Sequence, residues 1–379
     1  MWKAGGRQVR LLHPPLEEKL VHGFEGIDVG HRMRVQMINT EAERGFIDFK
    51  SVGRVIHRGA GFMSYEIYKK SFLVIVSILF ITSCSTSSLS RRDINQLAAG
   101  LTYVTIPAAV AHTAADVRLH YIEAGNSIAP AIILIHGFAA SSSTWKQIMP
   151  ELAKSYHVFA IDMIGFGFSD KPADFSYGRQ GYGETVLNFM EQKKLEKAIV
   201  VGNSMGGAIS LWIAIHHPER VTRLILIDTF GYPEKPSGML SMLHPWLKPF
   251  AHLLFGKAVV RKTLKQVYYD DSRITPELVE EYGRPFKTPH AKDVPFWLSE
   301  NLNAREDAEE FKKLPTIKIP TLILWGENDE FIAPEHAKSF HHDIQGSELV
   351  MIPQCGHIPQ EEKPEVVMRA ILEFLKKYS

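Results

Sequence analysis

The sequence predicts an α/β protein with a mostly parallel eight-stranded sheet, helices on both faces and a helical cap inserted after the sixth strand. From Leu101 onward, short β-rich runs alternate with helical patterns, the order expected of such a sheet. Several runs are continuous and apolar, such as residues 131–135 and 321–325, as in strands buried on both faces. The alternation stops between Asp228 and Pro320, where Pro, Met, Leu and aromatic residues accumulate.

The expected elements can be placed in order along the chain. Strands are predicted near residues 102–106, 117–123, 131–135, 157–162, 197–202, 222–228, 320–325 and 347–352. Helices are predicted at about 142–154, 179–193, 205–217, 334–341 and 363–378. We therefore expect a core of residues 101–230 and 316–379 and a cap of residues 231–315. An ordinary helical subdomain without a role in substrate binding is the alternative for the cap.

Composition excludes some classes of function. The chain has 379 residues, enough for two or three domains or for one large α/β domain with extensions. Its 43 Lys and Arg nearly balance its 42 Asp and Glu, so bulk charge predicts no nucleic-acid partner. Its two cysteines, Cys84 and Cys355, can form neither a disulfide framework nor a thiol metal site.

An apolar run inside the chain has the pattern of a targeting segment. Residues 71–83 follow Lys69 and Lys70, end at Cys84 and precede a Ser/Thr-rich stretch, as in a signal peptide. These 13 residues are too few for a membrane-spanning helix, which needs about 20. The ending Ile-Thr-Ser-Cys resembles a bacterial lipoprotein processing site, where the cysteine is lipidated. We predict a lipoprotein-type signal peptide at residues 63–84 and a membrane-anchored protein of the cell envelope; a buried core element is the alternative.

The segments around this signal have separate expectations. Residues 85–100 are read as a linker. Residues 1–62 are an extension, either a start-site artefact or a fused remnant, and Met63 is the expected biological start. Within the extension, residues 30–38 and 43–49 resemble the OB-like tail of RNase II-type exoribonucleases. That resemblance includes no catalytic residue, so we assign it no function.

A G-x-S-x-G pattern lies where a predicted buried strand meets a predicted helix. A sharp strand-to-helix turn crowds the backbone of Ser204, so Gly202 and Gly206 flank it, with Asn203 inside the turn. Ser204 then lies at a helix N-terminus, where free N–H groups favour developing negative charge. This context predicts a nucleophile, whereas a plain Gly/Ser turn would be the alternative.

A serine nucleophile needs a base and a third group that orients the base. Asp329 follows the seventh predicted strand, and His357 follows the last one, the only histidine to do so. The order Ser, Asp, His along the chain is one that serine hydrolases use. We predict His357 as the base and Asp329 as the acid, with Asp228 and Glu327 as the competing acids.

Acyl transfer also needs donors for the tetrahedral oxyanion, and removing one typically costs about 10²–10³ in turnover. We expect the backbone N–H of Met205, directly after the nucleophile, and that of Phe138, in the His-Gly-Phe segment after residues 131–135. A plain β-to-α turn is the alternative for that segment. This chemistry needs no metal and no cofactor.

These residues, together with the segment from Asp162 to Pro172, make the chain resemble the α/β-hydrolase family over about residues 101–379. Within that family it looks like monomeric esterases and monoacylglycerol-lipase-like enzymes, and it is similar to hydrolases that cleave C–C bonds in ring-fission products. Ser204 differs from the aspartate of haloalkane dehalogenases and soluble epoxide hydrolases. Residues 138–145 lack the Gly-Pro-Gly-Ala run usual in C–C hydrolases.

The resemblance implies a carboxylesterase or lipase that cleaves a small-molecule or lipid ester through an acyl-enzyme on Ser204. The Met- and aromatic-rich cap favours an apolar acyl group, and lipidation of Cys84 would anchor the protein to a membrane. A C–C bond hydrolase of the meta-cleavage type is one alternative, and thioesterase or haloperoxidase chemistry would use the same triad. A non-catalytic binding protein with a hydrolase-like fold is the alternative from another class.

Overall fold

The computed structural model describes residues 100–232, 256–301 and 309–378, together with the backbone of four short strands before residue 55. The chain divides into two units, Met1–Thr82 and Ser83–Ser379. The predicted signal peptide at 63–84 lies outside the described residues, as do Cys84 and all but the end of the predicted linker.

The first unit contains two pairs of antiparallel strands. β1 (Trp2–Ala4) pairs with β2 (Arg7–Val9), and β3 (Met33–Glu41) pairs with β4 (Phe46–Arg54). β3 and β4 each overlap one of the two stretches that resemble an exoribonuclease tail. The pairing of these two strands does not by itself assign them a role.

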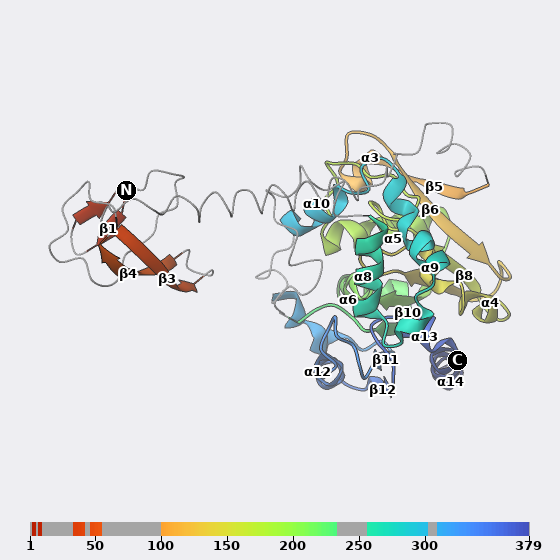
Figure 1. The fold of residues 1–379 in the computed structure, drawn as a ribbon. Coiled ribbons are helices and arrows are strands. Elements are labelled where there is room, and N and C mark those ends of the chain that lie inside the picture. Colours follow the sequence, from red (N-terminus) through yellow and green to blue (C-terminus); the bar gives the residue numbers. More distant parts are fainter. Residues whose placement is uncertain are drawn as a thin grey trace. The chain divides into compact units, whose positions relative to one another are not determined.

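The second unit is built on one eight-stranded sheet (Figure 1), in the order β12-β11-β10-β9-β7-β8-β6-β5. The strands are β5 (Thr102–Ile106), β6 (Val117–Ala124), β7 (Ala131–Ile135), β8 (His157–Ile161), β9 (Ala198–Asn203), β10 (Val221–Ile227), β11 (Thr321–Gly326) and β12 (Glu348–Ile352). β6 runs antiparallel to both of its neighbours, and all other pairs are parallel. Every strand lies within one residue of its predicted range, and the predicted fold class is confirmed.

Helices cover the sheet and connect its strands. They are α3 (Ala108–Ala111), α4 (Met149–Leu152), α5 (Arg179–Gln192), α6 (Met205–His216), α12 (Glu335–Asp343), α13 (Pro359–Glu362) and α14 (Pro364–Lys377). The continuous helix predicted at 142–154 is wrong, because the chain forms a 3₁₀ turn, Ser142–Trp145, and then the single turn α4. Pro150 lies in the first turn of α4, where its missing N–H is tolerated, but would break the interior of a longer helix.

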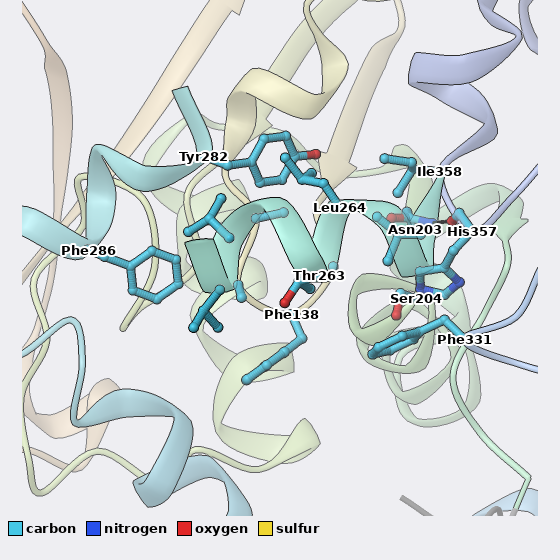
Figure 2. Close-up of a pocket in the computed structure, with 16 residues that line it drawn as sticks. Phe138, Asn203, Ser204, Thr263, Leu264, Tyr282, Phe286, Phe331, His357 and Ile358 are labelled. Atoms are coloured by element: carbon cyan, nitrogen blue, oxygen red, sulfur yellow. Dashed lines mark hydrogen bonds between the residues drawn. The ribbon is translucent and has the colours of Figure 1, made fainter. Parts of the chain in front are cut away.

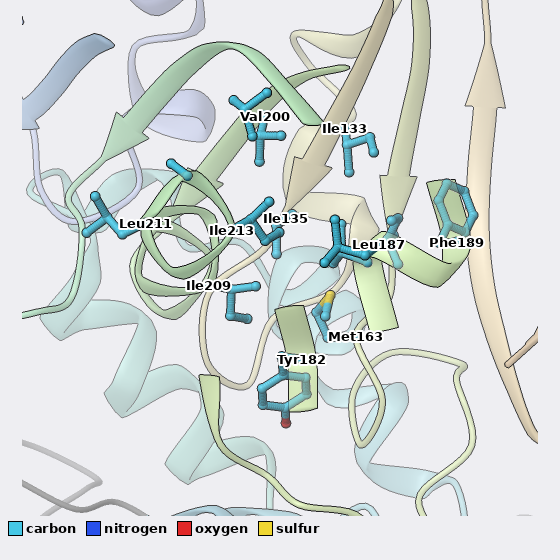
Figure 3. Packing of buried hydrophobic residues seen from close by; sticks show 14 of the residues in the cluster. Ile133, Ile135, Met163, Tyr182, Leu187, Phe189, Val200, Ile209, Leu211 and Ile213 are labelled. Atoms are coloured by element: carbon cyan, nitrogen blue, oxygen red, sulfur yellow. The ribbon is translucent and has the colours of Figure 1, made fainter. Parts of the chain in front are cut away.

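The core consists of two apolar layers, one on each face of the sheet. Ile133 and Ile135 of β7 face the layer that contains Ile209 of α6 and Phe189 of α5 (Figure 3). The alternate side chains of the same strand belong to the other layer, with residues of α14. This double burial explains why the central strands are continuous apolar runs rather than alternating ones.

Within its described residues, 231–232, 256–301 and 309–315, the segment predicted as a cap contains helices and loops and no strand. Its helices are α8 (Lys257–Val267), α9 (Pro276–Gly283) and α10 (Val294–Asn301), joined by 3₁₀ turns. α8 and α9 share a small apolar cluster that includes Val260, Leu264 and Val279. Across the described ranges, none of the helices combines the length and the apolar character needed to span a membrane.

The strand order determines where a ligand can bind. β7 lies between β8 and β9, so the connections from β7 and from β9 leave the sheet on different sides. In open α/β sheets such a switch point creates a crevice outside the carboxyl ends of the strands. Residues 136–138 follow β7, and Ser204 follows β9, at this crevice.

Candidate active site

Ser204 lies in a strained turn between β9 and α6. Its backbone has φ 54° and ψ −117°, outside the region that non-glycine residues normally adopt. A Cβ on Gly202 would lie 2.2 Å from the Gly206 carbonyl oxygen, and a Cβ on Gly206 would lie 2.1 Å from the carbonyl oxygen of Ile135. Only glycine fits at these two positions, which accounts for the G-x-S-x-G pattern.

His357 and Asp329 form the hydrogen-bonded pair that the sequence predicts. His357 Nδ1 lies 2.7 Å from Asp329 Oδ2, and the two side chains are 5% and 0% exposed. The other oxygen, Asp329 Oδ1, accepts the backbone N–H groups of Phe331 and Ile332 at 2.7 and 2.9 Å. These bonds fix the Asp329 side chain in place, so it can hold the proton of His357 on Nδ1 and leave Nε2 as a base.

Ser204 and His357 line the same cavity, and the imidazole lies beside the Ser204 side chain in Figure 2. The hydrogen bond between them is not formed among the described contacts, and enzymes of this chemistry commonly complete it when the substrate binds. The structure thus brings together Ser204, Asp329 and His357, which follow the ends of β9, β11 and β12 in the sequence.

The two competing acids lie in different environments. Glu327 is exposed. Asp228 is fully buried at the end of β10, where its Oδ1 accepts the N–H of Gly326 at 3.0 Å. The pKa of Asp228 is raised well above its ordinary value, mainly by burial and to a smaller extent by the neighbouring charge of Asp329. The raised pKa favours the protonated form of Asp228, whereas Asp329 is the residue that hydrogen bonds to His357.

One group of side chains in the described residues could supply three metal ligands. Single ligand atoms of Asp228, Asp329 and His357 all lie within 4.8 Å of one another. The latter two residues are already hydrogen bonded to each other, and a metal ion would have to break that bond. The arrangement fits proton transfer better than metal binding.

The two predicted oxyanion donors belong to segments next to Ser204. Met205 is the first residue of α6, where backbone N–H groups lack partners within the helix. Phe138 follows Gly137, whose absent Cβ would lie 3.1 Å from Ser204 Cβ, so this backbone passes close to the nucleophile. The oxyanion role of these two N–H groups stays a prediction.

An apolar cavity leads away from Ser204 and opens to solvent, and the empty space within it and at its mouth is about 720 Å³. In Figure 2 it runs from Ser204 and His357 past α8 toward Phe286. Its described lining consists of Gly137, Phe138, Ala139, Ala140, Asn203, Ser204, Val259, Val260, Thr263, Leu264, Val267, Tyr282, Phe286, Phe331, His357 and Ile358. None of these side chains is an acid, a lysine or an arginine.

The sequence did not predict the role of Glu361, a buried carboxylate that hydrogen bonds to a residue of the cavity wall. Glu361 is 2% exposed and accepts hydrogen bonds from the hydroxyls of Thr144, Tyr268 and Tyr282. Burial raises its pKa. Tyr282 lines the cavity, so Glu361 fixes part of its wall. A glutamate in a polar run after the histidine gives no signal in sequence of such a role.

Comparisons with known proteins agree with this architecture. The chain is 30% identical over 266 residues to the uncharacterized hydrolase YugF of Bacillus subtilis (strain 168), covering 70% of this chain and 96% of that one. It is also 30% identical over 272 residues to 2-hydroxymuconate semialdehyde hydrolase of Pseudomonas sp. (strain CF600), covering 69% and 92%. A solved membrane phospholipase A, described as a bacterial virulence factor, is similar with a TM-score of 0.59 and 26% identity, over 83% of this chain and 99% of that one.

The model of the alpha/beta hydrolase fold family matches residues 130–364, which include β7 to β12 and all the site residues described above. This match covers well over half of the chain. The protein belongs to the α/β hydrolase fold family.

Proposed function

We propose that this hydrolase is a serine carboxylesterase or lipase that cleaves esters of apolar acyl groups. One observation carries the proposal. Ser204, in its strained turn, and the His357–Asp329 pair open together into a cavity whose described lining has no charged acid, lysine or arginine side chain. An apolar cavity with a few convergent polar groups is the usual form of a site for an apolar ligand.

The proposed reaction has two halves. Ser204 Oγ attacks the ester carbonyl carbon while its proton passes to His357 Nε2, and the oxyanion accepts the N–H groups of Phe138 and Met205. His357 then gives that proton to the leaving alkoxide, which departs as the alcohol. A water molecule, deprotonated by His357, attacks the acyl-enzyme. The bond between the acyl carbon and Ser204 Oγ then breaks, His357 returns the proton to Ser204 Oγ, and the acid is released. Asp329 holds the imidazole and stabilises its charged form in both halves.

C–C bond hydrolysis is the competing function, because relatives include enzymes named for it. The name of one of them, 2-hydroxy-6-oxo-2,4-heptadienoate hydrolase from Pseudomonas putida, specifies a carboxylate substrate, at 28% identity over 270 residues. Burying a carboxylate requires a cation or several donors. The described lining of the cavity offers no lysine or arginine, which favours a neutral ester.

The test compares p-nitrophenyl esters of graded chain length and a ring-fission dienoate as substrates of the wild type and of Ser204→Ala. We expect ester hydrolysis by the wild type and a loss of at least about 10³-fold in Ser204→Ala. Ser339→Ala, at an exposed position of α12, should match the wild type. Equal rates for Ser204→Ala and the wild type would refute the proposal. Faster turnover of the dienoate would favour the C–C reaction, and failure of a fluorophosphonate to label Ser204 would favour a binding protein.

We also propose that lipidated Cys84 anchors the protein to a membrane of the cell envelope. The apolar run before Cys84 supports this proposal, and so does the similarity to a solved membrane phospholipase A. Mass spectrometry of the native protein should find a lipid-modified Cys84 as the first residue. An intact product that begins at Met1 and carries an unmodified Cys84 would overturn the anchor and leave the esterase proposal unaffected.

A further inference from the structure

We propose that Glu362 is a positioning residue that couples the helical cap to the catalytic base. This inference deepens the ester hydrolase proposal and rests on it for the role of His357. It concerns how the end of α8 and the loop of His357 are held together.

The Glu362 carboxylate joins two segments that are distant in sequence. Its Oε2 accepts the N–H of Gly356 at 2.7 Å, directly before His357, and the N–H of Tyr269 at 3.2 Å. Its Oε1 accepts the N–H of Asp270 at 2.8 Å. Glu362 is 0% exposed. Because three N–H donors compensate its burial and occupy both oxygens, the carboxylate can act as a fixed junction.

The backbone of His357 is held on both sides. Its N–H donates to the carbonyl oxygen of Val267 at 2.8 Å, at the end of α8, and its own carbonyl accepts from Asn203 Nδ2 at 3.1 Å. A Cβ on Gly356 would lie 2.4 Å from that same Val267 oxygen, so no larger residue fits between loop and cap. The position of the imidazole therefore depends on where α8 ends.

α8 is also a wall of the substrate cavity. Val260, Thr263, Leu264 and Val267 all line the cavity, and Figure 2 places Thr263 and Leu264 between Phe286 and Ser204. An acyl chain that packs against these side chains contacts the helix whose end holds His357. Occupation of the cavity can thus stabilise the productive position of the base, with Glu362 as the connection.

Glu362→Gln tests this connection with almost no change in volume. An amide has one oxygen, so its NH₂ group must face at least one of the three N–H donors. We expect kcat for an ester long enough to reach α8 to fall about tenfold, with a clearly smaller loss for the acetate ester and little change in KM. Equal losses for both esters, or no loss, would overturn the coupling.

A matched control breaks another link between cap and core. Lys146 forms an ion pair with Glu281 of α9, and both side chains are partly exposed. Lys146→Gln should give the same small change for both esters. If Glu362→Gln does not fold, Asp270→Pro removes one of the cap donors from an exposed residue, and the same ratio of losses is measured.

A measurement without substrate separates this inference from the esterase proposal. The proton shared by His357 Nδ1 and Asp329 should give a far-downfield NMR resonance. We expect Glu362→Gln to broaden it through faster exchange, while Lys146→Gln leaves it sharp. An unchanged resonance in Glu362→Gln would overturn the positioning role even if the wild type hydrolysed no ester, whereas a wild type without ester turnover would count only against the proposed function.

Discussion

His136 Nδ1 donates a hydrogen bond to the carbonyl oxygen of the next residue, Gly137, across 2.7 Å. We assign the proton to Nδ1 because the N–H of Met163 points at Nε2 from 3.0 Å, so Nε2 accepts. A trans peptide is planar, so fixing the oxygen of Gly137 also fixes the opposite N–H, which belongs to Phe138. Burial lowers the pKa of His136, which keeps the ring neutral and preserves both bonds.

Replacing His136 should therefore reduce turnover without removing any group that touches the substrate. For His136→Ala we expect kcat to fall about tenfold to hundredfold, less than the 10²–10³ typical when an oxyanion donor is lost. KM should change little, because the oxyanion forms only in the transition state. His136→Asn should retain more activity, since its amide nitrogen can replace Nδ1 as the donor to Gly137. Steady-state kinetics, normalised to titrated active sites, would measure this; a His136→Ala kcat equal to that of the wild type would contradict it.

The two buried aspartates beside His357 should respond differently to removal of their charge. Asp329→Asn should lower kcat by about 10³–10⁴, because the amide favours the wrong tautomer of the base. Asp228→Asn should remain close to the wild type, since its amide resembles the protonated carboxyl and can still accept the N–H of Gly326. Parallel kinetics on the two variants would decide between the acids. A loss in Asp228→Asn as large as that in Asp329→Asn would make Asp228 the orienting acid.

Asp228 also predicts a pH dependence of stability. Its pKa is raised by folding from an ordinary value of 3.8, so the folded protein keeps this proton at a pH where the unfolded chain has lost it. The contribution of Asp228 to the free energy of unfolding therefore falls as the pH rises above about 4, with a slope of at most about 1.4 kcal/mol per pH unit. Asp228→Asn lacks this ionisation, so its stability relative to the wild type should increase from pH 4 upward. Urea unfolding of both proteins across pH 4–8 would measure the difference, and a constant difference would contradict the raised pKa.

The sequence predicted the sheet well because its strands are buried on both faces. Runs such as residues 131–135 are continuous and apolar, and a parallel sheet brings its carboxyl ends to one edge. That geometry allowed Ser204, Asp329 and His357 to be grouped from their places after three strands. The same reasoning failed for residues 142–154. The sequence predicted one helix there, but the chain forms a 3₁₀ turn and then the short α4, which has Pro150 in its first turn.

The groups that support the site could not be found from the sequence, because their roles depend on tertiary contacts. Glu362 bonds to the N–H groups of Tyr269 and Asp270, more than ninety positions away in the chain. In sequence it is one of two adjacent glutamates, which usually mark a solvated surface. Asp228 could be proposed as an acid, but its raised pKa follows from burial beside Asp329, which no pattern of residues expresses.

The length of the substrate cavity should be set by Phe286. Figure 2 places this ring at the opposite end of the cavity from Ser204, beyond the side chains of α8. Phe286→Ala should open space for a longer acyl chain and move the preferred ester to greater length. Each additional buried CH₂ contributes about 0.8 kcal/mol, which corresponds to about fourfold in kcat/KM.

The measurement is a series of p-nitrophenyl esters assayed with both proteins. In the wild type, kcat/KM should rise with chain length and then level off or fall; in Phe286→Ala the rise should continue for at least one further CH₂ step. Val260→Phe provides the opposite change, because this residue lies on the α8 wall of the same cavity and a larger ring would shorten the usable space. It should move the optimum to shorter chains while acetate hydrolysis continues. If both variants keep the wild-type optimum, acyl chains do not bind along α8.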